Sequence, residues 1–158
     1  MNRRILTLLA CAVSVLAAAC SSSNSNSATI PPPHSVEKSA AISLGDSVCQ
    51  ALAADQQKFV DDFKISVPQP KAEEARDFVA STLTPRIEQA VGDFHRIGEP
   101  TKDKQDWDKL VSGLDQSLAD FKAKIATDPI GLLTVKPFAA QASRFFNLGL
   151  PQCTVLSV

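Results

Sequence analysis

The 158-residue sequence predicts an all-α fold, an up-and-down bundle of about four helices. Apolar residues recur at steps of three and four in successive stretches, which is the spacing of one face of a helix. Short breaks that contain proline or glycine separate these stretches, and short connections favour antiparallel neighbouring helices. Strand signals are nearly absent, because only the tail 153–158 has a strand-like composition, without an evident partner strand.

The first predicted helix ends before Val67-Pro68, because the residue before a proline avoids helical backbone angles. Ser43 is a candidate N-cap with Asp46 three residues later; the alternative is a start nearer Val36. The apolar face expected to be buried consists of Leu44, Val48, Leu52, Phe59, Val60 and Phe63.

The second predicted helix keeps its helical spacing across Thr84-Pro85. A proline inside a helix removes one hydrogen bond and clashes with the preceding turn. The segment is therefore either one helix kinked at Pro85 or two helices, the second capped by Thr84. Its apolar face consists of Ala72, Ala75, Val79, Leu83, Ile87, Ala90 and Phe94.

The third and fourth predicted helices complete the bundle. The third ends at Asp128-Pro129, and the fourth covers about Val135 to Asn147 before Gly149 and Pro151 stop it. The apolar stripe of the third helix consists of Trp107, Leu110, Val111, Leu114, Leu118, Phe121 and Ile125. The fourth helix carries Phe138, Ala139, Ala142, Phe145 and Phe146.

Residues 1–19 have the pattern of a signal peptide. Two arginines precede an uncharged, largely apolar run of about 15 residues, whereas a membrane-spanning helix needs roughly 20. The following stretch, SSSNSNSATIPPPHS at 21–35, carries no Lys, Arg, Asp or Glu and few side chains that could be buried, so we expect a disordered tether. The helical domain is expected over residues 36–158.

The run Val15-Leu-Ala-Ala-Ala-Cys20 resembles the cleavage region of a bacterial lipoprotein precursor. The resemblance implies that a signal peptidase cuts before Cys20 and that the thiol of Cys20 carries the lipid. Ala17 stands where the preferred pattern has leucine, and the alternative is plain secretion after an Ala-x-Ala cut. We therefore expect an extracytoplasmic protein whose residues 20–35 anchor and tether it to the cell membrane.

Cys49 and Cys153 are the cysteines left once Cys11 leaves with the signal peptide and Cys20 is lipidated. Two cysteines in an exported domain indicate one disulfide, which would close the bundle; the alternative is two buried free thiols. The layout also resembles that of small actinobacterial envelope lipoproteins, which pair a cysteine in the first helix with a Gly-Leu-Pro-x-Cys near the C-terminus, here residues 149–153. This resemblance implies an address and a helical fold but no reaction.

The sequence carries little catalytic potential, and we expect no enzyme, no cofactor and no metal site. His34 falls in the tether, and His95 lies at the end of the second helix, where an imidazolium suits the helix dipole better than a metal role. Removal of Arg3 and Arg4 with the signal peptide leaves 14 basic and 17 acidic residues, a net charge of −3, so nucleic acid is not an expected partner.

Two functions from different classes remain. The first is a non-enzymatic scaffold or partner-binding module in the cell envelope. The alternative is a carrier or sensor of a lipid or another hydrophobic ligand, because the chain has many large rings for a small bundle. Phe145 and Phe146 are the candidate contacts for such a ligand, since adjacent helical residues cannot both face the centre of the core.

Replacement of the proposed anchor cysteine, Cys20→Ala, should release the protein from membranes or leave its precursor uncleaved. The reason is that the thiol of Cys20 is the atom to which the lipid would be attached. Labelling of cells with radioactive palmitate measures this directly. Incorporation of label into the Cys20→Ala protein would contradict the assignment of the anchor.

Overall fold

The computed structural model describes residues 36–156, which lie in one compact unit. The α-helices are α1 (Lys38–Ser66), α2 (Ala72–Phe78), α3 (Thr84–Ile97), α4 (Lys104–Lys124) and α5 (Ala142–Leu148). A π-helical turn, η1 (Val79–Leu83), joins α2 to α3, and three 3₁₀ segments, η2 (Gly131–Leu133), η3 (Ala139–Gln141) and η4 (Pro151–Leu156), lie in the C-terminal part. The predicted all-α class is confirmed for the described residues, where the one β-type pairing is an isolated bridge between Val36 and Pro100.

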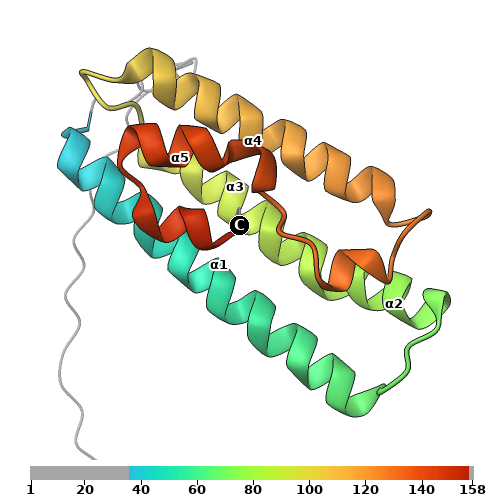
Figure 1. Ribbon diagram of the computed structural model, residues 1–158. Helices are drawn as coiled ribbons and strands as arrows, with labels where there is room; N and C mark the ends of the chain where they lie inside the picture. The colour runs from blue at the N-terminus through green and yellow to red at the C-terminus, as the bar shows by residue number, and fades with distance from the viewer. Residues whose placement is uncertain (1–35, 157–158) are drawn as a thin grey trace, which may run out of the picture. The chain divides into compact units, whose positions relative to one another are not determined.

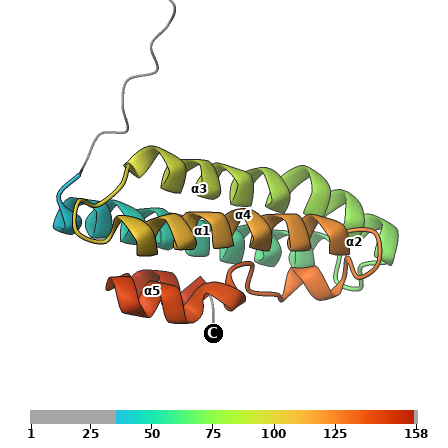
Figure 2. The ribbon, with the colours of Figure 1, turned by 90° about the horizontal axis from the view of Figure 1, so that it is seen from above.

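Successive long helices run antiparallel, so that α1 and α4 point the same way and α3 runs opposite to both, as Figure 1 shows. α1 packs against α3 and η4, and α4 packs against α3 and α5. Figure 2 shows α3 on one side of the bundle and α5 on the other. The C-terminal segment thus supplies the fourth side of the bundle with one short helix and a 3₁₀ segment instead of one long helix.

The buried face of α1 is largely the predicted one, but its N-terminal part differs. The helix begins at Lys38, so the start nearer Val36 is correct and the cap at Ser43 is wrong. Of the predicted face, Leu52 and Val60 are buried, and Val48, Phe59 and Phe63 are partly buried against the core. Leu44, expected in the core, is 50% exposed. Ala41, Gly45 and Cys49 are buried instead, because the C-terminal segment packs on the side that carries Gly45 and Cys49, as described below.

The path from α2 to α3 is continuous through Pro85, so the alternative of two separate helices is wrong. The backbone N–H of Thr84 donates to the carbonyl oxygen of Val79, five residues earlier, and the Thr84 hydroxyl donates to the same oxygen at 2.9 Å. Proline offers no N–H to the preceding turn and needs room for its ring, and the wider π-helical turn accommodates both. The predicted apolar face is confirmed, apart from the exposed Ala72.

The third predicted stripe is confirmed, since Trp107, Leu110, Leu114 and Phe121 are buried. The fourth predicted helix is wrong in its first half, because α5 begins at Ala142 and only the 3₁₀ turn η3 precedes it. Pro137 explains the difference, since it holds the residue before it away from helical angles.

The motif 149–153 turns the chain from α5 onto α1. Gly149 has φ 80° and ψ 38°, a left-handed conformation that suits glycine. Its N–H donates to the carbonyl of Phe146 at 3.1 Å, and the N–H of Leu150 donates to the carbonyl of Phe145 at 2.9 Å. This pair of bonds is a Schellman motif. Phe145 and Leu150 occupy the two positions of its usual apolar contact, and both are fully buried.

The turn presses the C-terminal segment against α1 and positions the disulfide. The N–H of Gln152 donates to a carboxylate oxygen of Asp46 at 3.0 Å, and Cys153 is bonded to Cys49 with an S–S distance of 2.03 Å. The predicted disulfide is therefore confirmed. It links residues 104 apart in sequence, and in the chain-entropy account a loop of this length contributes about 4–5 kcal/mol to stability. The tail forms η4 rather than a strand and packs on α1; Cys153 and Leu156 are buried, whereas Val155 is 50% exposed.

Gly45 is the residue of α1 that allows this close approach. A Cβ atom at Gly45 would lie 2.8 Å from Cδ2 of Leu150 and 3.2 Å from Cε1 of Phe94, and both side chains are fully buried. We refer to the contact of Gly45 and Cys49 with Leu150 and Cys153 as the C-terminal seam.

From the seam we predict that alanine substitutions at two helical glycines change the free energy of unfolding in opposite directions. Gly45→Ala should lower the free energy of unfolding, because overpacking a filled core costs about 1–3 kcal/mol. Gly92→Ala in α3 is the matched control, since a Cβ there meets nothing within 4 Å and alanine gains about 0.8–1.0 kcal/mol in helix propensity. Urea unfolding with the disulfide intact measures both. Equal stabilisation by the two substitutions would show that Leu150 does not press on α1.

Candidate binding groove

The residues singled out from the sequence do not form one site. Cys20 lies outside the described residues. Cys49 and Cys153 form the buried disulfide of the C-terminal seam. Phe145 is fully buried, whereas Phe146 is 78% exposed, so the two face different environments and ligand contact by this pair stays a prediction.

The rings of the core pack on one another. The centroid of the Phe94 ring lies 5.9 Å from that of Trp107 and 6.3 Å from that of Phe145, and Phe145 lies 6.4 Å from Phe138 in an edge-on arrangement. Each of these side chains is at most 2% exposed. These four rings thus fill the centre of the bundle.

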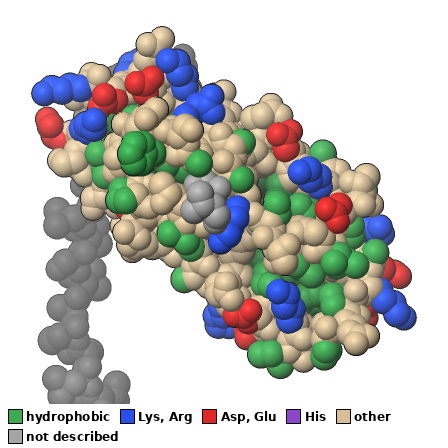
Figure 3. All heavy atoms as spheres, in the orientation of Figure 1, with side chains coloured by type: hydrophobic (Ala, Val, Ile, Leu, Met, Phe, Trp, Pro, Cys, Tyr) green, Lys and Arg blue, Asp and Glu red, His purple; other side chains and the backbone are tan. Residues whose placement is uncertain are grey.

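An open groove lies beside this core, between the C-terminal half of α1 and the segment that connects η2 to η3. Its volume is about 380 Å³, and the end of η4 forms part of its wall. Figure 3 shows hydrophobic side chains gathered over this part of the bundle, with lysines around them. The lining residues are Ala53, Gln56, Gln57, Val60, Asp61, Lys64, Leu133, Thr134, Val135, Lys136, Val155 and Leu156.

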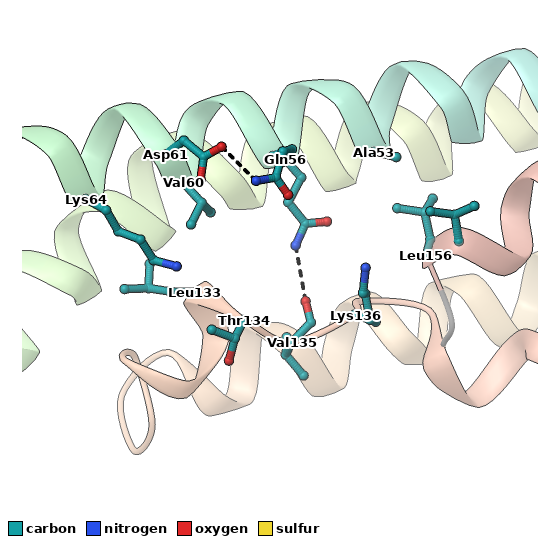
Figure 4. A pocket seen from close by; sticks show the side chains of 12 residues that line it. Ala53, Gln56, Val60, Asp61, Lys64, Leu133, Thr134, Val135, Lys136 and Leu156 are labelled. Carbon is teal, nitrogen blue, oxygen red and sulfur yellow. Dashed lines mark hydrogen bonds between the residues drawn. The ribbon is translucent and has the colours of Figure 1, made fainter.

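Gln56 crosses the groove and divides its apolar lining. Its side-chain nitrogen donates to the carbonyl oxygen of Val135 at 3.1 Å, which ties α1 to the connecting segment. Figure 4 shows Val60 and Leu133 on one side of this bond, and Ala53 and Leu156 on the other. The groove therefore has two apolar ends with an amide between them.

Two lysines reach into the groove from opposite walls. Figure 4 shows Lys64 pointing from α1 toward the connecting segment and Lys136 pointing from that segment toward α1. Within residues 36–156 neither ammonium has an ion-pair partner. The carboxylate in the lining, Asp61, accepts a hydrogen bond from the side chain of Gln57 at 2.7 Å. The side chains that line the groove thus carry two positive charges and one negative charge, a net charge of +1, in a chain whose net charge is −1.

The acidic pair Asp61-Asp62, which stands at the unfavourable end of α1 for the helix dipole, is compensated locally. Lys58 donates to Asp62 one helical turn away at 2.6 Å, and the hydrogen bond and charge of Asp62 raise the pKa of Lys58 above its ordinary value. These contacts are exposed, so they identify no separate site.

His95 lies at the C-terminal end of α3, as predicted, and borders a second hollow of about 320 Å³. Its Nε2 atom is 3.0 Å from a carboxylate oxygen of Asp115 on α4, and both side chains are about half exposed. In the part of the chain that the structure describes, no group of three or more His, Cys, Asp or Glu residues could hold a metal ion. None of the helices formed by residues 36–156 is long and apolar enough to cross a membrane.

Comparison of the chain with protein-family models, with curated proteins and with solved structures found no match.

Sequence reasoning missed the groove. Its walls come from segments about 80 residues apart, and the α1 residues on its wall are mostly polar, so they interrupt the apolar spacing by which helices are recognised. The excess of polar residues on one side of α1 between Gln56 and Lys64 is the single signal that could have pointed to it.

The amide bridge across the groove can be tested by its effect on stability. Gln56→Ala should lower the free energy of unfolding by about 1 kcal/mol, because it removes a partly buried hydrogen bond between distant segments. Gln57→Ala is the control, since it removes an exposed bond within α1, worth about 0.2–0.5 kcal/mol. Urea unfolding gives both values, and a Gln56→Ala effect no larger than that of Gln57→Ala would show that the bridge does not hold the groove together.

Proposed function

We propose that the protein is a non-enzymatic partner-binding module of the cell envelope, anchored to the cell membrane by a lipid on Cys20. The observation that carries the proposal is the open groove, with its net positive charge, on the outside of a filled core. A groove that is open to solvent is accessible to a segment of another protein, and many peptide-recognition modules bind their partners in such grooves.

The packing of the aromatic residues supports this function over that of a carrier. An apolar ligand in the centre of the bundle would have to displace Phe94, Phe138 or Phe145, each of which is fully buried against its neighbours. Loss of such packing costs several kcal/mol, as large-to-small substitutions in cores show.

A carrier or sensor of a hydrophobic ligand is the second candidate function. The specific observation in its favour is the size of the groove, since about 380 Å³ lies within the usual range for small-molecule sites, about 300–1,000 Å³. The ligand would then lie in the groove rather than in the core.

One experiment separates the two functions. Cells that produce the full-length chain are treated with a membrane-permeant crosslinker, and the protein is isolated from its native membranes. Mass spectrometry then quantifies the proteins and lipids that accompany it. For a binding module, we expect an envelope protein to be isolated with the chain in a stoichiometric amount. A stoichiometric hydrophobic molecule without a protein partner would contradict the proposal and support the carrier.

A further inference from the structure

We infer that the groove between α1 and the segment 133–136 binds an extended, acidic peptide segment of the partner protein, with apolar side chains at its two ends. This inference rests on the proposed function, since it names the chemistry of the partner of that same groove.

The division of the groove by Gln56 favours a peptide over an acyl chain. An acyl chain needs a continuous apolar lining, because a polar group buried without a hydrogen bond is unfavourable. Here an amide stands between the end formed by Val60 and Leu133 and the end formed by Ala53 and Leu156. A peptide matches this order of apolar end, amide and apolar end, since its apolar side chains alternate with polar backbone groups.

The side-chain oxygen of Gln56 is also available to accept a hydrogen bond from a peptide backbone. The side-chain nitrogen is used by the carbonyl oxygen of Val135, but the side-chain oxygen accepts no hydrogen bond from the described residues. A backbone N–H of an extended chain is a donor of suitable strength for that oxygen.

The length of the groove sets the spacing of the apolar side chains. Ala53 and Val60 are seven residues apart on α1, which corresponds to about 10 Å along a helix that rises 1.5 Å per residue. An extended chain covers about 3.3 Å per residue, so the two apolar side chains lie about three positions apart, with two residues between them.

The charges of the groove determine the residues between those ends. Lys64 and Lys136 enter from opposite walls and have no carboxylate partner within residues 36–156, in contrast to Lys58, which is paired with Asp62. Carboxylates on the peptide would complete two charge-assisted bonds, and the opposite positions of the lysines suit one carboxylate on each side of an extended chain.

The test uses the full-length chain in detergent micelles and fluorescein-labelled peptides, with fluorescence anisotropy as the readout. The probe has the core Leu-Asp-Glu-Val between glycines. One control peptide, Leu-Asn-Gln-Val, removes the charges, and a second, Gly-Asp-Glu-Gly, removes the apolar ends. We expect the probe to bind at least tenfold more tightly than either control peptide.

Charge reversal in the groove provides the matched protein variants. The double variant Lys64→Glu, Lys136→Glu should weaken binding of the probe at least tenfold. The double variant Lys102→Glu, Lys124→Glu changes the net charge equally, outside the groove, and should weaken it less than twofold. Equal losses in the two variants, or no preference for the probe over its controls, would overturn the inference. Dodecanoate serves as the competing acyl chain. If it displaced the probe and bound more tightly than the probe, the inference would also be overturned, in favour of an acyl-chain ligand.

The same variants distinguish failure of this inference from failure of the proposed function. Both are carried through the crosslinking experiment in cells. If the groove variant and the control variant retain a stoichiometric protein partner equally well, the assignment of the groove is overturned, but the proposed binding function is not. Absence of any stoichiometric protein partner from the unsubstituted chain would overturn the proposed function itself.

Discussion

The C-terminal seam on α1 is the contact on which the rest of the bundle depends. Three segments meet there: α1 at Gly45 and Cys49, α3 through Phe94, and the chain end through Leu150 and Cys153. The absence of a side chain at Gly45 lets Leu150 reach the helix, and the disulfide holds the segment in place. Without this contact α5 would lack its connection to α1, and Phe145, which packs on Phe94 and Phe138, would lose part of its cover.

The same seam creates the groove. The segment 149–156 covers the N-terminal half of one side of α1, where Asp46 and Cys49 hold it, and it ends at Val155 and Leu156 in the wall of the groove. The C-terminal half of that side of α1 remains open, and Gln56 spans it to Val135. The wall formed by Val155 and Leu156 belongs to the segment that the disulfide ties to α1. An extracytoplasmic location, as expected from the N-terminal segment, would allow that disulfide to persist.

Much of the bundle could be predicted, and the errors have identifiable causes. The faces of α3 and α4 follow from helical spacing, because apolar residues at steps of three and four line the side of each helix that is buried. On α1, the apolar pattern indicates Leu44 rather than Gly45, since a glycine adds no apolar side chain to the pattern. In the fourth predicted helix, the aromatic spacing continues through Pro137, but the residue before a proline avoids helical angles and the helix begins later.

The amino-acid sequence by itself determined the all-α class, the C-terminal ends of α1 and α3 and the cysteines available for pairing, because helical spacing, proline and glycine breaks and cysteine number are local or compositional properties. Only the tertiary structure decided how Pro85 is accommodated, which side of α1 is buried and where a groove remains. The last two depend on contacts between residues about 80 to 105 apart, such as Gln56 with Val135 and Gly45 with Leu150. Such contacts have no periodic signature, because residues such as Gln56 and Gly45 are polar or small and their partners lie far away in the sequence.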